Sequence, residues 1–131
     1  MAWTNIGKQR MFEQFFEASS APSDFYLAAS PSSAEFNAST VYVSSVGEVT
    51  ASGGYVSGDL LVERGGGVSG FLTTTGVDFA IAELSPSGSY VLSASEGTIN
   101  DVKVFMLTDD NATVGGREIY AYWSTGSDVD I

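Results

Sequence analysis

The chain has 131 residues, a length that fits one domain over 1–131 and leaves little room for a second. Hydrophobic residues make up 44% of it, including 8 Phe, 6 Tyr and 2 Trp, so a well-buried core is expected. Only 16% of the residues are charged, and 16 acidic side chains against 5 basic ones give a net charge of -11. Because nucleic acids and anionic membranes attract basic patches, this balance predicts that the chain binds neither.

The chain contains no cysteine and no histidine. The lack of cysteine excludes disulfides, thiolate zinc sites and thiol nucleophiles, and it leaves the redox compartment open. The lack of histidine excludes His-based triads and His metal ligands, and it removes the commonest general base near neutral pH. We therefore predict a protein that is not an enzyme and holds no cofactor or metal.

The N-terminal stretch 1–5 lacks a basic region followed by an apolar run. No stretch approaches the roughly 18 consecutive apolar residues that a membrane span needs. We expect synthesis in a cytoplasm, without a secretion signal of its own.

One helix is predicted in the N-terminal segment 1–21. Apolar side chains recur there at spacings near 3.6, between polar ones, and they are Ile6, Met11, Phe12, Phe15 and Phe16. Thr4 or Asn5 suits the N-cap, and the stretch 19–22 ends the helix. The simpler interpretation is a helix laid over one end of a sheet. The alternative is that its Phe-rich stripe docks into a neighbouring subunit.

From residue 25 onward, short apolar runs alternate with Gly, Ser, Asn and Asp at intervals of about ten residues, which is typical of a sandwich or barrel. The predicted strands are 25–29, 60–63, 79–84, 90–93, 102–108 and 118–124. The stretch 40–50 is ambiguous between strand and loop, and 44–76 is the least regular part. The predicted fold is mainly β, an antiparallel, jelly-roll-like β-sandwich with one N-terminal helix, followed by an acidic C-terminal tail at 125–131.

The last predicted strand has apolar or aromatic residues on both faces. Strict alternation places Ile119, Ala121 and Trp123 on one side and Tyr120 and Tyr122 on the other. A strand of this kind is expected where a second sheet covers one face and a helix or a neighbouring subunit covers the other.

Three acidic residues, Glu83, Glu96 and Glu118, lie on or beside predicted strands. A glycoside hydrolase needs two carboxylates that flank a cleft, but 16 acids make some close pair inevitable by chance. The glycine-rich run 65–70 lacks the Lys followed by Ser or Thr that a phosphate-binding loop requires. Solvated rim positions and turns are the preferred interpretations of these residues.

Oxygen ligands for calcium are available at Asp109, Asp110 and Asn111, and Asp128 and Asp130 could join them if the tail folds back. The spacing does not match an EF-hand, which also needs a central Gly and a distant Glu. A turn followed by a solvated acidic tail is the preferred interpretation, and structural calcium is the alternative.

As a whole the chain resembles a diverse set of small structural proteins of tailed bacteriophages. The resemblance covers most of the chain and rests on segments in a consistent order: WTNIGKQR at 3–10, FYLA at 25–28, GEV at 47–49, SGGYVSG at 52–58, VFMLTDD at 104–110 and REIYAYW at 117–123. The glycine- and threonine-rich stretch 64–75 departs from the pattern. The resemblance implies no catalytic residues.

The resemblance implies a virion structural protein, and our first expectation is a capsid decoration or cement protein that stabilises the head by bridging capsid subunits. Its partners would be the major capsid protein or other virion subunits, and a homo-oligomer is expected. The alternatives are a neck, tail or fibre-base component and a host glycan-binding module in which Tyr55, Tyr120, Tyr122 or Trp123 stacks on sugars. The predicted contact residues are Met11, Phe12, Phe15, Phe16, Tyr120, Tyr122 and Trp123, and ordinary core packing is the competing explanation for each.

Overall fold

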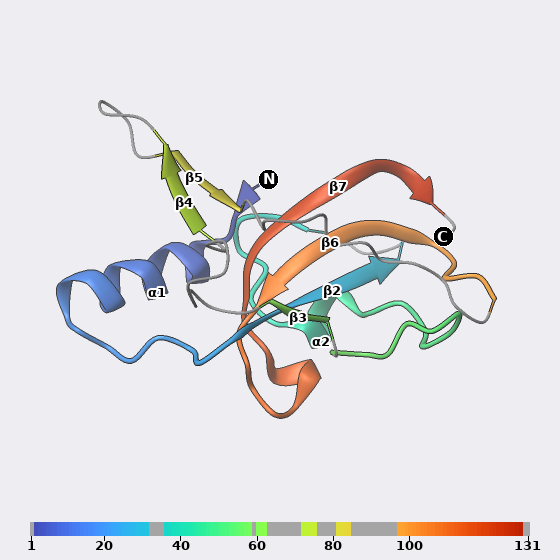
Figure 1. Ribbon diagram of the computed structural model, residues 1–131, viewed down its shortest axis with the longest axis horizontal. Coiled ribbons are helices and arrows are strands. Elements are labelled where there is room, and N and C mark those ends of the chain that lie inside the picture. The colour runs from blue at the N-terminus through green and yellow to red at the C-terminus, as the bar shows by residue number, and fades with distance from the viewer. Residues whose placement is uncertain are drawn as a thin grey trace.

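The computed structural model describes residues 2–31, 36–58, 60–62, 72–75, 81–84 and 97–129 (Figure 1). Its helices are α1 (Asn5–Phe16), α2 (Val43–Val46) and the 3-10 turn η1 (Val114–Gly116). Its strands are β1 (Ala2–Trp3), β2 (Phe25–Pro31), β3 (Leu60–Val62), β4 (Leu72–Thr75), β5 (Ile81–Leu84), β6 (Val102–Thr108) and β7 (Ile119–Val129). Five strands form an antiparallel sheet in the order β1-β7-β6-β2-β3, and β4 and β5 form a separate hairpin. The protein is mainly β with an N-terminal helix, as the sequence predicts.

Most predicted strands correspond to observed ones. The predictions at 25–29, 102–108 and 118–124 are confirmed as β2, β6 and β7, 60–63 corresponds to β3 as far as residue 62, and 79–84 corresponds to β5 from residue 81. The prediction at 90–93 lies outside the described residues, as does 79–80. The ambiguous stretch 40–50 contains the short helix α2 and a single bridge between Tyr42 and Glu118. Two of the described strands, β1 and β4, are not predicted from the sequence, because each is short and has no apolar alternation of its own.

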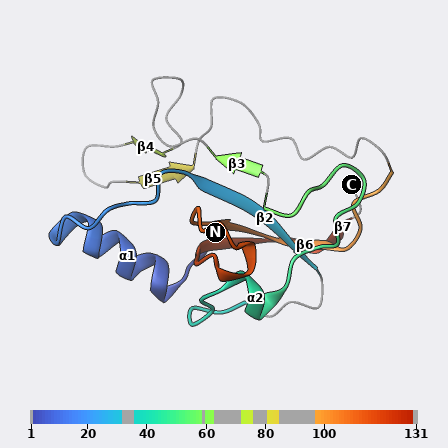
Figure 2. The ribbon, with the colours of Figure 1, turned by 90° about the horizontal axis from the view of Figure 1, so that it is seen from below.

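Side chains of the central strands divide between two faces of the sheet. Leu27, Leu107 and Ala121 lie side by side across β2, β6 and β7 and form one buried cluster. The opposite face carries Ala28 and Met106, against which α2 and its flanking segment pack (Figure 2). Both faces of this sheet therefore contribute to the core.

The predicted faces of β7 are wrong before the register shift. Ile119 pairs with Thr108, whereas Ala121 pairs with Leu107, because the register shifts between Leu107 and Thr108. An extra residue in one strand of a pair moves the residues before it in that strand to the opposite face of the sheet. Ile119 therefore packs in the cluster of Met106, on the face opposite to Ala121.

β7 is also longer than predicted. It continues to Val129, which pairs with Val102, so residues 125–129 of the expected acidic tail belong to the strand. A second register shift between Val102 and Val104 accommodates the extra residues. The polar composition of this stretch predicts a solvated tail, but its backbone pairs with β6 instead.

The segment 47–58 covers the edge of β2 beyond the point where β3 pairs with it. The amide of Val49 donates to the carbonyl of Ala29 at 2.9 Å, and the amide of Ala29 donates to the Tyr55 hydroxyl at 3.0 Å. That hydroxyl donates in turn to Glu48. Burial, together with this bond to the Glu48 carboxylate, raises the pKa of Tyr55, although the bond from Ala29 opposes the rise. A single phenol thus satisfies a buried strand amide and a carboxylate.

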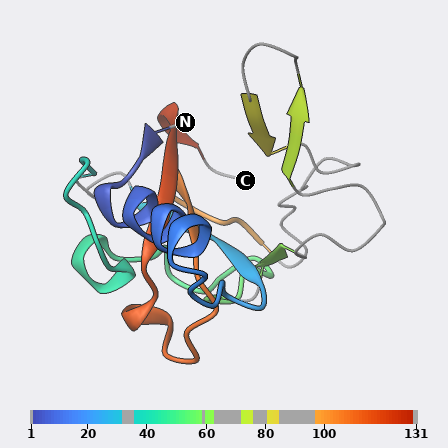
Figure 3. The ribbon, with the colours of Figure 1, turned by 90° about the vertical axis from the view of Figure 1, so that its left-hand side faces the viewer.

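The N-terminal helix is fixed to β7 through the backbone. Thr4 is its N-cap, accepting from the amide of Gly7 at 3.0 Å, and the Thr4 hydroxyl donates to the carbonyl of Ile119. The Thr4 amide donates to the carbonyl of Tyr120 at 3.0 Å. A Cβ built on Gly7 would lie 2.3 Å from that same carbonyl oxygen, so only glycine allows this approach. Figure 3 shows the helix nearly end-on in front of the sheet.

Replacing Gly7 with Ala should destabilise the fold. The added methyl overlaps the Tyr120 backbone, and overpacking of this kind costs about 1–3 kcal/mol, offset in part by roughly 1 kcal/mol of improved helix propensity. Urea unfolding measures the difference. The control is Gly115→Ala, whose Cβ would meet only Ser44 Cβ at 3.5 Å, and it should change the free energy of unfolding little. Equal effects of the two substitutions would contradict the close contact.

Replacing Tyr55 with Phe should also lower stability. The substitution keeps the ring but leaves the buried Ala29 amide without its partner, which costs about 1–3 kcal/mol. Urea unfolding again measures the change. Tyr42→Phe is the control because that side chain is 46% exposed, and it should fall within about 0.5 kcal/mol of the wild type. A Tyr55→Phe variant as stable as this control would refute the proposed role of the hydroxyl.

Candidate functional site

The exposed face of α1 is the most unusual surface in the described part of the chain. The exposed fractions of Met11, Phe12, Phe15 and Phe16 are 40%, 62%, 81% and 71%. The rings contact one another, with centroids 5.8 Å apart for Phe12 and Phe16 and 4.9 Å apart for Phe15 and Phe16. We call these four side chains the Phe face. The structure therefore brings four of the predicted contact residues together on one surface.

The side of α1 that faces the protein is, by contrast, mostly small or polar. Gly7 is buried, and Ile6, Arg10, Glu13 and Gln14 are partly buried. An amphipathic helix ordinarily turns its apolar stripe inward and its charges outward. In α1 this orientation is reversed for Phe12, Phe15 and Phe16: the helix contacts β7 through its Gly7 side, and the three rings are exposed. The reason is the backbone contact at Gly7, which leaves no room for the Phe side.

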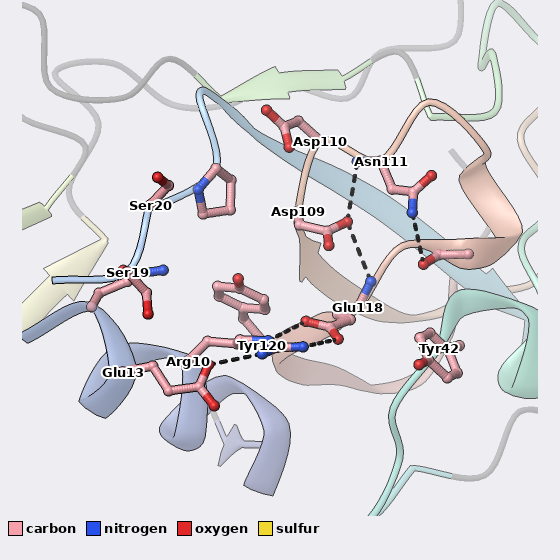
Figure 4. A pocket seen from close by; sticks show the side chains of 13 residues that line it. Arg10, Glu13, Ser19, Ser20, Tyr42, Asp109, Asp110, Asn111, Glu118 and Tyr120 are labelled. Carbon is pink, nitrogen blue, oxygen red and sulfur yellow. Dashed lines mark hydrogen bonds and ion pairs between the residues drawn. The ribbon is translucent and has the colours of Figure 1, made fainter. Parts of the chain in front are cut away.

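The ion pair between Arg10 and Glu118 fixes the rotation of α1 about its axis, and a second pair, between Arg10 and Glu13, lies within the helix. The Arg10 guanidinium donates to both carboxylate oxygens of Glu118, at 2.8 and 2.7 Å, and to Glu13 at 2.8 Å (Figure 4). The bond to Glu118, followed by the bond to Glu13, raises the pKa of Arg10 further above its usual value. The Arg10 bond also lowers the pKa of Glu13. A bidentate guanidinium–carboxylate pair restricts geometry strongly, so the Phe face has a defined direction.

A polar hollow of about 520 Å³ lies between α1 and the turn that joins β6 to β7 (Figure 4). Its charged lining residues are Arg10, Glu13, Asp109, Asp110 and Glu118. Asp109 accepts from the amides of Asn111 and Glu118 at 3.2 and 3.3 Å, and Asp110 accepts from the amide of Ser23 at 2.8 Å. Burial raises the pKa of Asp109, and the nearby charges of Glu118 and Asp110 add to the rise. Asp109 therefore closes the turn, and Asp110 joins the turn to the segment between α1 and β2.

The positions of the acidic side chains can be compared with what a calcium site or a hydrolase would need. Within the described ranges, no three acidic side chains gather closely enough to hold a metal ion. Glu118, one of the three acids on predicted strands, is bound at both oxygens by Arg10. Glu83 and Glu96, and the tail residue Asp130, lie among residues or side chains that the structure does not describe.

The remaining predicted contact residues belong to β7 and pack within the chain. Tyr120 is 4% exposed and contacts Phe25, with ring centroids 5.5 Å apart, and its burial raises its pKa to about 12. Tyr122 and Trp123 are half-buried, the first against Phe36 and the second against Phe105. Tyr55 is 3% exposed. The aromatic residues considered for sugar stacking thus have their faces largely covered by this chain.

Sequence reasoning missed the residues that orient the Phe face. The sequence indicates Thr4 only as a possible cap, and no pattern in it assigns a structural role to Gly7 or Arg10. A glycine inside a helical pattern is a signal of close backbone approach. The partner of Arg10, Glu118, lies 108 residues away in the sequence, so no local pattern could identify the pair.

Comparison with known proteins gives no relative. No protein-family model matches the chain, and neither the curated proteins nor the solved structures contain a match. No helix in the described ranges is long and apolar enough to cross a membrane.

Replacing Asp109 with Asn should alter the pH dependence of stability. An acid with a raised pKa in the folded state stabilises the fold below its unfolded pKa, and this contribution is lost as pH rises through the folded value. Asn retains an acceptor oxygen but does not ionise. The difference in unfolding free energy, variant minus wild type, should therefore grow in favour of the variant between about pH 3 and pH 7. Urea unfolding across this range measures it, and a constant or falling difference would contradict the assignment.

Proposed function

We propose that this chain is a non-enzymatic structural protein of a tailed-phage virion, acting as a capsid decoration or cement protein that bridges capsid subunits. The observation that carries the proposal is the Phe face, which is apolar, exposed and held in a fixed direction by Gly7 and Arg10. The resemblance of the sequence to small phage structural proteins supplies the class of particle. The low proportion of charged residues also suits a surface that packs against other subunits.

The size of the Phe face supports a role in binding. Taking roughly 200 Å² for each full side chain, the four residues expose on the order of 500 Å² of apolar area. An exposed apolar patch this large on a small protein commonly marks an interaction site. At about 25 cal/mol per Å², covering it would contribute about 12 kcal/mol, which is comparable to the 4–15 kcal/mol that association costs. The face is therefore large enough to anchor an interface that includes further contacts.

The finer fold that fits this role is a jelly-roll-like β-sandwich. Two observations support it, the separate β4–β5 hairpin and the presence of partly buried aromatics at the border of the Leu27 cluster. A second sheet packed on that cluster would cover Trp3, Phe25 and Trp123. The five-stranded sheet would then be one layer of two.

A neck, tail or fibre-base position is the second candidate, because the Phe face would serve equally well there. The two positions differ in stoichiometry, since necks and tails are rings of low copy number. A glycan-binding role is less well supported, because Tyr55 and Tyr120 are buried and Tyr122 and Trp123 are half-covered.

Purified particles should contain the chain in hundreds of copies, and deleting its gene should leave heads that break at lower temperature or on osmotic shock. A cement protein stabilises the shell by burying area at many repeated contacts, so removal weakens every contact at once. Quantitative mass spectrometry and a heat-release assay for DNA measure the two effects. About six or twelve copies would indicate the neck or tail instead, and absence from the particle would refute a virion role.

A further inference from the structure

We propose that α1 binds as a helix in an apolar groove of a different virion subunit, with a carboxylate of that subunit beside Lys8. The proposal rests on the proposed function and specifies its partner. The binding residues are those of the Phe face together with Lys8. A second copy of this chain is not the occupant. This mode of recognition uses one helical stripe at positions i, i+4 and i+7 as anchors.

The geometry of α1 is suited to insertion. The helix extends away from the five-stranded sheet in Figures 1 and 2, and its inward side is held by the Gly7 contact and the ion pair between Arg10 and Glu118. The Phe face therefore cannot turn inward without breaking these contacts. A helix that is already formed and oriented loses little conformational freedom on binding, which favours affinity.

Charge identifies the chemistry of the groove. Lys8 lies at i, with Phe12 at i+4 and Phe15 at i+7, so its ammonium is on the same side of α1 as the two rings. Among the described residues, no carboxylate forms an ion pair with Lys8, whereas Arg10 has two and Arg117 is buried. In a chain with a net charge of -11, an exposed cation beside an apolar stripe complements an acidic group on the partner.

Area and charge both disfavour a second copy as the occupant. Symmetric pairing of two α1 helices would cover at most the roughly 500 Å² of the Phe face on each chain, below the approximately 800 Å² per partner of a standard interface. It would also bring together two chains that each carry a net charge of -11. A groove encloses the helix on three sides and so buries more area for the same stripe.

Cross-linking from α1 identifies the occupant directly, since the absence of cysteine makes an introduced one unique. Phe16→Cys labelled with a benzophenone maleimide restores an aromatic group on the Phe face. The labelled chain is added to particles that lack the protein and is irradiated. The expected product joins the chain to a different virion subunit. The control is Asn100→Cys with the same label, because Asn100 is exposed and lies just before β6, at the end of that strand away from α1 (Figure 1).

Each other outcome of the cross-linking has a defined meaning. A product between two copies of this chain, a product within one chain, or no product above the Asn100 control would overturn the groove assignment while leaving the virion role intact. Absence of the wild-type chain from purified particles would overturn the virion role, and the groove assignment with it.

Binding of variants to the same depleted particles tests the chemistry of the groove. Phe15→Ser should keep the wild-type thermal melt, because the side chain is 81% exposed, yet weaken binding by about tenfold or more. Lys8→Glu should weaken binding to the particles about tenfold at low salt, and Lys8→Arg should not. The control is Lys103→Glu, which changes the net charge by the same amount as Lys8→Glu but lies on β6, and it should leave binding unchanged. Equal losses for Lys8→Glu and Lys103→Glu would show that only overall charge matters and would refute the acidic contact.

Discussion

The close approach of α1 to β7 is the contact on which the exposed surface depends. Gly7 lets the helix reach the carbonyl of Tyr120, and Thr4 joins the start of the helix to the same strand through its amide and hydroxyl. With the helix this close, Gly7 is its buried residue, and Ile6, Arg10, Glu13 and Gln14 are the partly buried ones. The aromatic residues must then point outward.

The ion pairs of Arg10 complement this backbone contact. Gly7 sets the distance between helix and strand, while the bidentate bond to Glu118 sets the rotation of the helix. Glu118 is itself placed by the turn between β6 and β7, whose amides are bound by Asp109. The residues around the polar hollow therefore support the Phe face: Glu118 binds Arg10, and Asp109 holds the turn that places Glu118.

A second polar network holds the loop that covers the edge of β2. Arg117 is buried with its guanidinium 4.1 Å from the centre of the Tyr26 ring, and it donates to the carbonyl of Gly58 at 3.0 Å. The amide of Gly58 donates to Glu48 at 3.1 Å, the carboxylate that Tyr55 also binds. Gly58 has a φ of +70°, which favours glycine at this junction. A sheet edge that would otherwise be open to pairing is closed in this way.

The sequence by itself determined the elements whose signals are local. The helix near the N-terminus, its N-cap at Thr4 or Asn5 and the strands 25–29, 102–108 and 118–124 follow from periodicity, capping and turn residues, which act within a few positions. Tertiary structure decided which side of each helix and strand is turned toward the core. The stripe of Phe12, Phe15 and Phe16 reads in sequence as a core-facing side, and only the contact of Gly7 with a strand more than 100 residues away reverses it. The facing of Ile119 likewise depends on a register shift against β6, because pairing between strands, rather than composition within one, decides which side each residue takes.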